Sequence, residues 1–293
     1  MKVKKGHIET FKCSFTQEDF DRFADLTGDN NPIHVDPEFS ARTHFGQTVA
    51  HGMLLYSTIC RVLSTRYPGP GVLQLKQDMM FQNPTYTDTE ITINLEVIDV
   101  QIPQQWAKLS TLISLPDGKP ACDGSTTIHL PGWQGGFPGI DAGMAAAGDS
   151  EAQSLKRLQV GQSAAAKKKI NAEDLSEYAA LTKDTNPLFN DAAYCRRLGF
   201  RDCIIPGPLL SGMFSDLLGT KLPGRGTNWL KQKLHFPAPA YMGDEITARV
   251  EIVRLRPEKD LVNLIGTCKN PSGEWVCQAQ SLVLVRDLEE YRL

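Results

Sequence analysis

Two side chains that can transfer protons stand close together early in the sequence. Asp29 and His34 are five positions apart, across a bend at Asn31-Pro32. A carboxylate and an imidazole at this spacing can converge on one water molecule, and histidine has the side-chain pKa nearest to neutrality. Alone, Asp29 would be an ordinary turn acid and His34 an ordinary loop histidine. Together they predict general acid–base catalysis by this pair.

A second group of interest is His51-Gly52-Met53, where an apolar helical pattern begins. The first N–H groups of a helix are unpaired and partly positive, so they can stabilise an oxygen that becomes negative during a reaction. Gly52 is the candidate donor, because glycine lets a ligand approach the backbone closely. For His51 we favour a packing or backbone role over that of a second base. The histidine spacing matches no zinc motif, and we expect neither a metal nor a redox cofactor.

Two helices and several strands are expected to position these residues. Thr16 is a good N-cap with an acid three residues later, and it predicts a helix over 17–27. A second helix, apolar on most faces and therefore buried, should run from Gly52 to about Leu63. Strands are expected at 73–81, 90–100, 107–115 and 126–130. A buried helix followed by an antiparallel meander predicts an α+β fold with a sheet curled around the helix.

An internal repeat organises the whole chain. At a constant offset of 155 residues, Asp29 matches Asp184, Asn31-Pro32 matches Asn186-Pro187, and Gly52 matches Gly207. We therefore expect a first domain at 1–130 and a second at 159–293. A Gly-, Ala- and Pro-rich connector at 131–158 should join them and have little structure of its own.

The run Gly28-Asp29-Asn30-Asn31-Pro32-Ile33-His34-Val35-Asp36, followed by His51-Gly52-Met53, resembles the hydratase motif of the MaoC-like (R)-specific enoyl-CoA hydratases and dehydratases. The resemblance implies two tandem hot-dog domains, each an antiparallel sheet wrapped around a central helix, paired as an internal pseudo-dimer. It also implies reversible hydration of a trans-2-enoyl thioester to an (R)-3-hydroxyacyl thioester.

The resemblance makes Asp29 and His34 the catalytic residues that act on one water molecule. With the Gly52 N–H as the oxyanion donor, these three form the expected catalytic set. Asn31, His51 and Met53 are expected to bind substrate, and Asn31 is also assigned to orienting the loop or the dyad. The substrate would be an acyl-CoA or an acyl carrier protein thioester.

The second repeat departs from this pattern. Phe189 stands at the position of His34, Pro206 at that of His51, and Pro208 at that of Met53. Phenylalanine cannot transfer a proton, so this half should be catalytically silent while it keeps the fold. We therefore expect one active site per chain, and the silent half could still help to form the acyl tunnel.

The composition of the chain indicates which classes of binding partner and which cellular location to expect. The chain has 31 Lys and Arg against 34 Asp and Glu, which indicates neither nucleic acid nor an anionic membrane as a partner. Lys167-Lys168-Lys169, the densest basic cluster, is interpreted as the solvated edge of a strand. The chain has seven cysteines without a CxxC spacing and lacks an 18-residue apolar run. These features predict a soluble cytoplasmic protein. A homodimer of whole chains is left open as a further assembly.

The sequence also leaves two other functions open. The chain could be a non-catalytic subunit that binds acyl thioesters, as the second half alone would suggest. It could also be a hot-dog acyl-CoA thioesterase, because a fold does not determine its chemistry. Release of free thiol from an acyl-CoA would identify the thioesterase.

Overall fold

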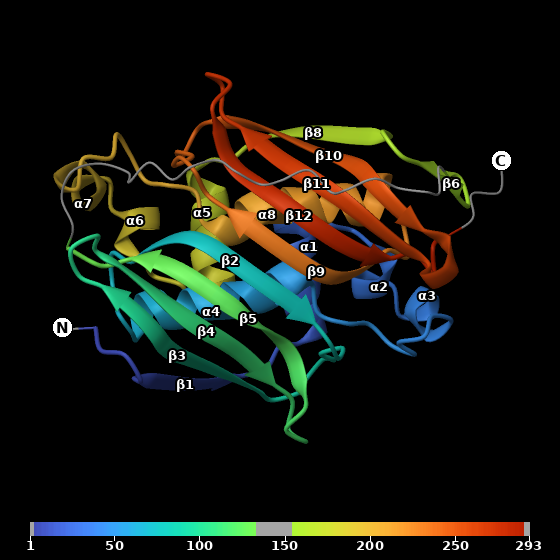
Figure 1. Ribbon diagram of the computed structural model, residues 1–293, viewed down its shortest axis with the longest axis horizontal. Helices are drawn as coiled ribbons and strands as arrows, with labels where there is room; N and C mark the ends of the chain where they lie inside the picture. Colours follow the sequence, from blue (N-terminus) through green and yellow to red (C-terminus); the bar gives the residue numbers. More distant parts are fainter. Residues whose placement is uncertain (1–2, 133–153, 290–293) are drawn as a thin grey trace.

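The computed structural model describes residues 3–132 and 154–289 of the chain. Ten strands form one antiparallel sheet in the order β1-β3-β4-β5-β2-β9-β12-β11-β10-β8. Figure 1 shows β2 and β9 side by side in the middle of this sheet and β1 and β8 at its edges. The strands are β1 (Ile8–Cys13), β2 (Leu73–Phe81), β3 (Ile91–Gln101), β4 (Trp106–Ser114), β5 (Pro120–His129), β8 (Ser163–Lys169), β9 (Asn228–His235), β10 (Glu245–Arg256), β11 (Leu261–Lys269) and β12 (Trp275–Leu284).

The two halves join edge to edge through backbone hydrogen bonds between β2 and β9. Gln77 pairs with Leu234 and Met79 pairs with Gln232, and all four side chains are buried. Because residues paired in a ladder point to the same face, the two half-sheets share one apolar face. The two repeats therefore form a pseudo-dimer within one chain.

The helices lie behind this face of the sheet (Figure 1). In the first half they are α1 (Gln17–Thr27), the short α2 (Pro32–Val35) and α3 (Pro37–Ala41), and the long α4 (Gly52–Thr65). Their counterparts are α5 (Ala172–Thr182), α6 (Pro187–Asn190), α7 (Ala192–Arg197) and α8 (Gly207–Asp216), which continues as a π-helical turn at Leu217–Lys221. Capping boxes at Thr16 and Asn171 begin α1 and α5.

Helices α4 and α8 are the central elements of the two halves, and they contact each other. Met53, Leu54 and Ile59 of α4 are almost completely buried, as are Phe214 and Leu217 of the second half. Apolar side chains on most faces make such a helix stable only inside the protein. Its N-terminus therefore opens into the interior rather than into solvent.

The α+β class, the two main helices and the strand at 73–81 agree with the sequence-based prediction. Three details differ: β1 was not expected, β5 begins at Pro120 rather than near 126, and the bend after Asn31 contains α2 and α3. Lys167–169 do lie on an edge strand, because β8 pairs only with β10.

The expected connector at 131–158 falls mostly outside the described residues. In its described part, β6 (Ser154–Leu155) pairs with β7 (Leu158–Gln159) as a short ribbon. The domain boundaries stay a prediction. Within residues 3–132 and 154–289, no helix is both long enough and apolar enough to cross a membrane.

Candidate active site

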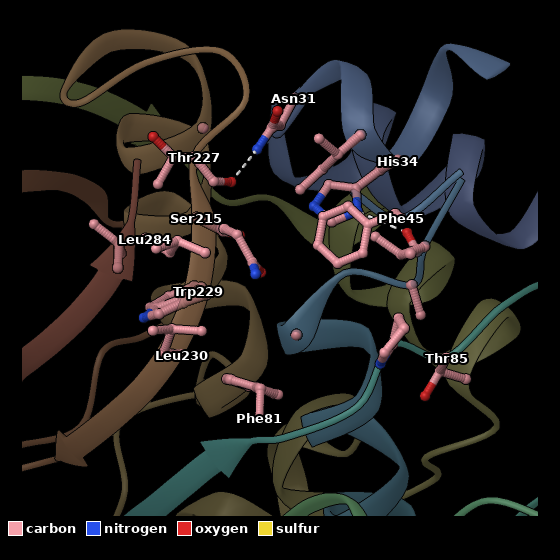
Figure 2. Close-up of a pocket in the computed structure, with 18 of the residues that line it drawn as sticks. Asn31, His34, Phe45, Phe81, Thr85, Ser215, Thr227, Trp229, Leu230 and Leu284 are labelled. Carbon is pink, nitrogen blue, oxygen red and sulfur yellow. Dashed lines mark hydrogen bonds between the residues drawn. The ribbon is translucent and has the colours of Figure 1, made fainter. Parts of the chain in front are cut away.

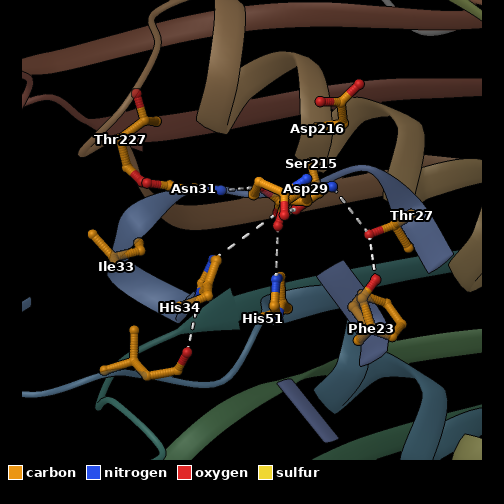
Figure 3. A network of polar contacts seen from close by, with 12 residues as sticks. Phe23, Thr27, Asp29, Asn31, Ile33, His34, His51, Ser215, Asp216 and Thr227 are labelled. Atoms are coloured by element: carbon orange, nitrogen blue, oxygen red, sulfur yellow. Dashed lines mark hydrogen bonds and ion pairs between the residues drawn. The ribbon is translucent and has the colours of Figure 1, made fainter. Parts of the chain in front are cut away.

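Asp29 and His34 lie together at the interface between the two halves (Figure 3). Helix α1 ends at Gly28, whose φ of 87° turns the chain, and Asp29 follows directly. His34 lies on the single turn of α2, which Pro32 begins. Both side chains are buried, and Nε2 of His34 lies 4.0 Å from Oδ2 of Asp29. Two acceptors at this distance can both bond to one water molecule.

The hydrogen bonds of His34 determine which of its nitrogens can act as a base. Its Nδ1 lies 2.7 Å from the carbonyl oxygen of Val49. A carbonyl can only accept, so Nδ1 carries the hydrogen and Nε2 keeps a free lone pair toward Asp29. Burial lowers the pKa of His34 below 6.5, and the Asp29 carboxylate and the Val49 bond only partly offset this effect. At neutral pH the ring is therefore uncharged and ready to accept a proton.

The carboxylate of Asp29 is held by groups from both halves. Its Oδ2 accepts a hydrogen bond of 2.5 Å from Oγ of Ser215, which lies on α8. Its Oδ1 accepts from the backbone N–H of Asn31 at 3.2 Å. Gly219 packs against the same carboxylate, and a Cβ at this position would lie only 2.7 Å from Oδ1 of Asp29. These contacts fix the carboxylate opposite His34.

Gly52, the expected oxyanion donor, is the first residue of α4 and lines the same cavity. None of the described residues accepts a hydrogen bond from its N–H. The ring of Phe81 packs so closely that a Cβ on Gly52 would lie 2.7 Å from it. The backbone N–H is therefore accessible only because residue 52 has no side chain.

Met53 and His51, both expected to bind substrate, do not line the cavity, although His51 does have the packing and backbone contacts that we favoured for it. Met53 is fully buried in the core and is not among the described residues that line the cavity, because its side chain lies on another face of α4. His51 is also fully buried outside the cavity lining. Its Nε2 lies 3.1 Å from the carbonyl oxygen of Asp29, and its ring stacks on His34. Neither side chain is therefore exposed to the cavity in which we place the substrate.

Asn31 does line the cavity, but its amide is used by the protein. Nδ2 donates to the carbonyl of Thr227 at 2.9 Å, and Oδ1 accepts from the N–H of Gly226 at 3.1 Å. The second half repeats this arrangement, with Asn186 bonded to Gly71 and Val72 at the same distances. Asn31 thus fixes the active-site loop to the other half rather than binding substrate directly.

A cavity of about 320 Å³ opens beside the dyad and extends between the halves (Figure 2). In Figure 2, Phe81 and Thr85 of the first half lie opposite Trp229, Leu230 and Leu284 of the second. The apolar side chains that line it are Ile33, Phe45, Val49, Leu55, Phe81, Leu218, Trp229, Leu230, Val283 and Leu284.

The second-half residues of the site were not identified from the sequence. Ser215 and Gly219 contact Asp29 although they are more than 180 positions away. The internal repeat does align these residues with the first half, because Ser215 matches Cys60 and Gly219 matches Ser64. It could not tell which half's aspartate these positions would face.

The equivalent site in the second half is closed. Asp184 is bonded there by Oγ of Ser64 at 2.5 Å and by the hydroxyl of Tyr178 at 3.3 Å. A Cβ on Gly207 would lie 2.7 Å from the hydroxyl of Tyr56. Phe189 replaces the base, and the remaining cavity measures only about 40 Å³. Burial raises the pKa of Asp184 to about 6.

Asp29, His34 and His51 bring possible metal-ligand atoms within 4.8 Å of one another. The Nε2 of His51, however, donates its hydrogen to the Asp29 carbonyl, so it has no lone pair for a metal. The rings of His34 and His51 are stacked, with centroids 3.8 Å apart and planes inclined by 27°. The arrangement suits proton transfer better than metal binding.

Residues 4–113 match the family model of the MaoC like domain, and residues 159–279 match the FAS1-like dehydratase domain region. The chain is 42% identical over 130 residues to an (R)-specific enoyl-CoA hydratase of Aeromonas caviae, covering 44% of this chain and 97% of that protein. It is 34% identical over 129 residues to a 3-hydroxybutyryl-CoA dehydratase of Methylorubrum extorquens, covering 44% and 82%.

Among solved structures, a Mycobacterium tuberculosis protein described as having a double hotdog fold matches with a TM-score of 0.73. The two chains are 15% identical, and the match covers 96% of each. This likeness confirms the expected pair of tandem hot-dog domains.

Proposed function

Since the chain belongs to the MaoC-like dehydratase family, we propose that its first half adds water to a trans-2-enoyl thioester and forms the (R)-3-hydroxyacyl thioester. The enzyme is a hydro-lyase, so the same site also catalyses the reverse dehydration. Both relatives act on CoA thioesters by name, and CoA is the proposed carrier. The observation that carries the proposal is the 4.0 Å approach of His34 Nε2 to Asp29 Oδ2 in the cavity that Gly52 also lines.

Proton transfer in this site follows from the hydrogen bonds. One water molecule donates one hydrogen to Asp29 and the other to the free Nε2 of His34, so its oxygen lone pair is directed at Cβ of the substrate. As the C–O bond forms, His34 takes a proton from the water. The electron pair of the C=C bond moves onto Cα and the thioester oxygen, and the proton held by the dyad then goes to Cα. His34 is left neutral and the product carries the whole water molecule.

The thioester oxygen becomes negative midway through this reaction. The N–H of Gly52, at the positive end of α4, would donate to it. Removal of one such donor typically costs about 100- to 1000-fold in rate. This donor requires the thioester to lie against Gly52 and the ring of Phe81.

The acyl chain would occupy the apolar part of the cavity, to which the second half contributes Leu218, Trp229 and Val283. The silent half thus acts as a wall of the single proposed site. Among the described residues, no histidine lines the cavity beside Asp184, and its volume of about 40 Å³ leaves no room for an acyl group. Pairing of two whole chains as a homodimer stays a proposal.

The test is to incubate the protein with trans-2-enoyl-CoAs of increasing chain length and follow loss of the enoyl absorbance. We expect 3-hydroxyacyl-CoA of R configuration as the only product and no release of free thiol. Thiol release without hydration would make the protein a thioesterase. Binding of the acyl-CoA without any turnover would make it a binding subunit.

A further inference from the structure

His51 contacts both members of the dyad without reaching the cavity. Its ring is fully buried and stacks on the ring of His34, with centroids 3.8 Å apart and planes inclined by 27°. Phe20 and Phe23 of α1 pack against it from other sides. Its Nε2 bonds to the backbone carbonyl of Asp29 at 3.1 Å. Figure 3 shows His51 beside Asp29 and His34. His51 also directly precedes Gly52 in the chain, so it adjoins all three proposed catalytic groups.

The hydrogen bond to Asp29 also determines the form of the His51 ring. A carbonyl oxygen can only accept, so Nε2 of His51 carries the hydrogen and Nδ1 is a bare acceptor. Within the described part of the chain, Nδ1 has no hydrogen-bond partner. Burial, and the nearby charge that His34 can acquire, lower the pKa of His51 well below 6.5. The ring is therefore a neutral donor to Asp29 at physiological pH.

The second half supplies a natural comparison, since Pro206 stands at the matching position. The backbone is the same at both sites, with φ −59° and ψ 135° at His51 and φ −56° and ψ 141° at Pro206. A helix begins at the next glycine in each half. The start of the helix therefore does not require histidine. The silent half lacks both rings of the stack, because Phe189 also replaces His34.

On the basis of the function proposed above, we propose that His51 is a positioning residue for the hydratase reaction. Its Nε2–H holds the backbone of Asp29, and its stacked ring holds His34 at the angle from which Nε2 meets the water. The ring also covers one face of His34 and keeps water from it. Among the described residues, His34 is the ionisable side chain whose charge acts on His51, whereas Asp29 acts on it through the hydrogen bond of its backbone carbonyl.

Two substitutions separate these contributions. His51→Phe keeps a flat ring on His34 but removes the donor to Asp29. His51→Gln keeps an N–H donor but removes the ring. Pro206→Ala, at the matching position of the silent half, is the control. The measurements are kcat and KM against pH for one trans-2-enoyl-CoA, together with the melting temperature of each variant.

We expect both His51 variants to lose about 10- to 100-fold in kcat, as small misplacements of reacting groups do. KM should change little, because the substrate does not touch residue 51. In His51→Gln, water gains access to His34, so the acidic limb of the kcat profile should move up toward pH 6.5. In His51→Phe that limb should stay in place. Pro206→Ala should behave as the wild type.

Nitrogen-15 NMR of the histidine rings in the wild type supplies a test that does not depend on whether a variant folds. His51 should stay neutral in the Nε2–H form while His34 titrates below pH 6.5. Titration of His51 near 6.5, or wild-type kcat and pH profiles in both variants, would overturn the proposal and leave the hydratase function standing. If the wild type hydrates no substrate, the hydratase proposal fails, and the NMR result alone decides the state of His51.

Discussion

Ser215 of the second half donates a hydrogen bond of 2.5 Å to the carboxylate of Asp29 in the first half. The two residues are 186 positions apart, and they meet because α8 lies against the end of α1. The second half, which has Phe189 at the position that matches His34, thus supplies a direct contact to the dyad of the first half.

Ser215→Ala should lower kcat by about 10- to 100-fold, because a hydrogen bond to a charged group contributes roughly 1.5–3 kcal/mol. The loss of kcat is measured by steady-state hydration of a trans-2-enoyl-CoA. The matched control is Ser64→Ala, which removes the 2.5 Å bond to Asp184 in the closed site. Equal losses of kcat in both variants would mean that Ser215 acts through stability alone.

Gly219→Ala should impair catalysis while the protein stays folded. A Cβ at this position would lie 2.7 Å from Oδ1 of Asp29 and 2.7 Å from Cβ of Asn31. The Asp29 loop must therefore shift, and a displacement of reacting groups by about 1 Å can cost roughly 100-fold in rate. Circular dichroism and kcat are the measurements. Ser64→Gly, at the matching position of the silent site, should keep its activity.

Asn31→Ala and Asn186→Ala should both destabilise the protein by about 2–6 kcal/mol. Each removes two hydrogen bonds to buried backbone groups of the other half, and an unsatisfied group costs roughly 1–3 kcal/mol. Urea unfolding measures the free energies. Only Asn31→Ala should also lower kcat well below the wild-type value, because only Asn31 adjoins the dyad. A fully active Asn31→Ala enzyme would contradict this role.

Asp184→Asn should gain stability relative to the wild type as pH rises. Burial raises the pKa of Asp184 from 3.8 to about 6, so the folded state keeps a proton that the unfolded state has already lost. Stability of the wild type therefore falls between pH 4 and 6, by at most about 3 kcal/mol. Asparagine has no such titration. Urea unfolding at pH 4 and pH 7 should show the difference growing, and a difference independent of pH would refute the assignment.

The sequence predicted the elements that depend on local pattern. The capping box at Thr16 marked the start of α1, and the offset of 155 residues revealed the two halves. The strand β1 escaped notice because it is an edge strand whose side chains are half-buried or exposed, so its apolar alternation is weak. The first residues of β5 were missed because Pro120, Asp123 and Gly124 are residue types that are depleted in strands.

The dyad could be predicted because Asp29 and His34 are neighbours in the sequence. The contacts of Asp29 with Ser215 and Gly219 could not, because they depend on how α8 packs against the other half. Met53 was assigned to the substrate because it follows Gly52 in the motif. Each residue turns a helix by about 100°, so the side chain of Met53 points into the core and not toward the cavity that Gly52 lines.

In the proposed function, one Asp–His pair, in the first half only, carries the reaction. The most direct measurement is hydration of a trans-2-enoyl-CoA by His34→Ala and Asp29→Asn, with Asp184→Asn as the matched control. We predict losses of about 100- to 10,000-fold for the first two variants and wild-type turnover for the third. A His34→Ala enzyme as active as the wild type, or an Asp184→Asn enzyme without turnover, would show that this pair alone does not carry the reaction.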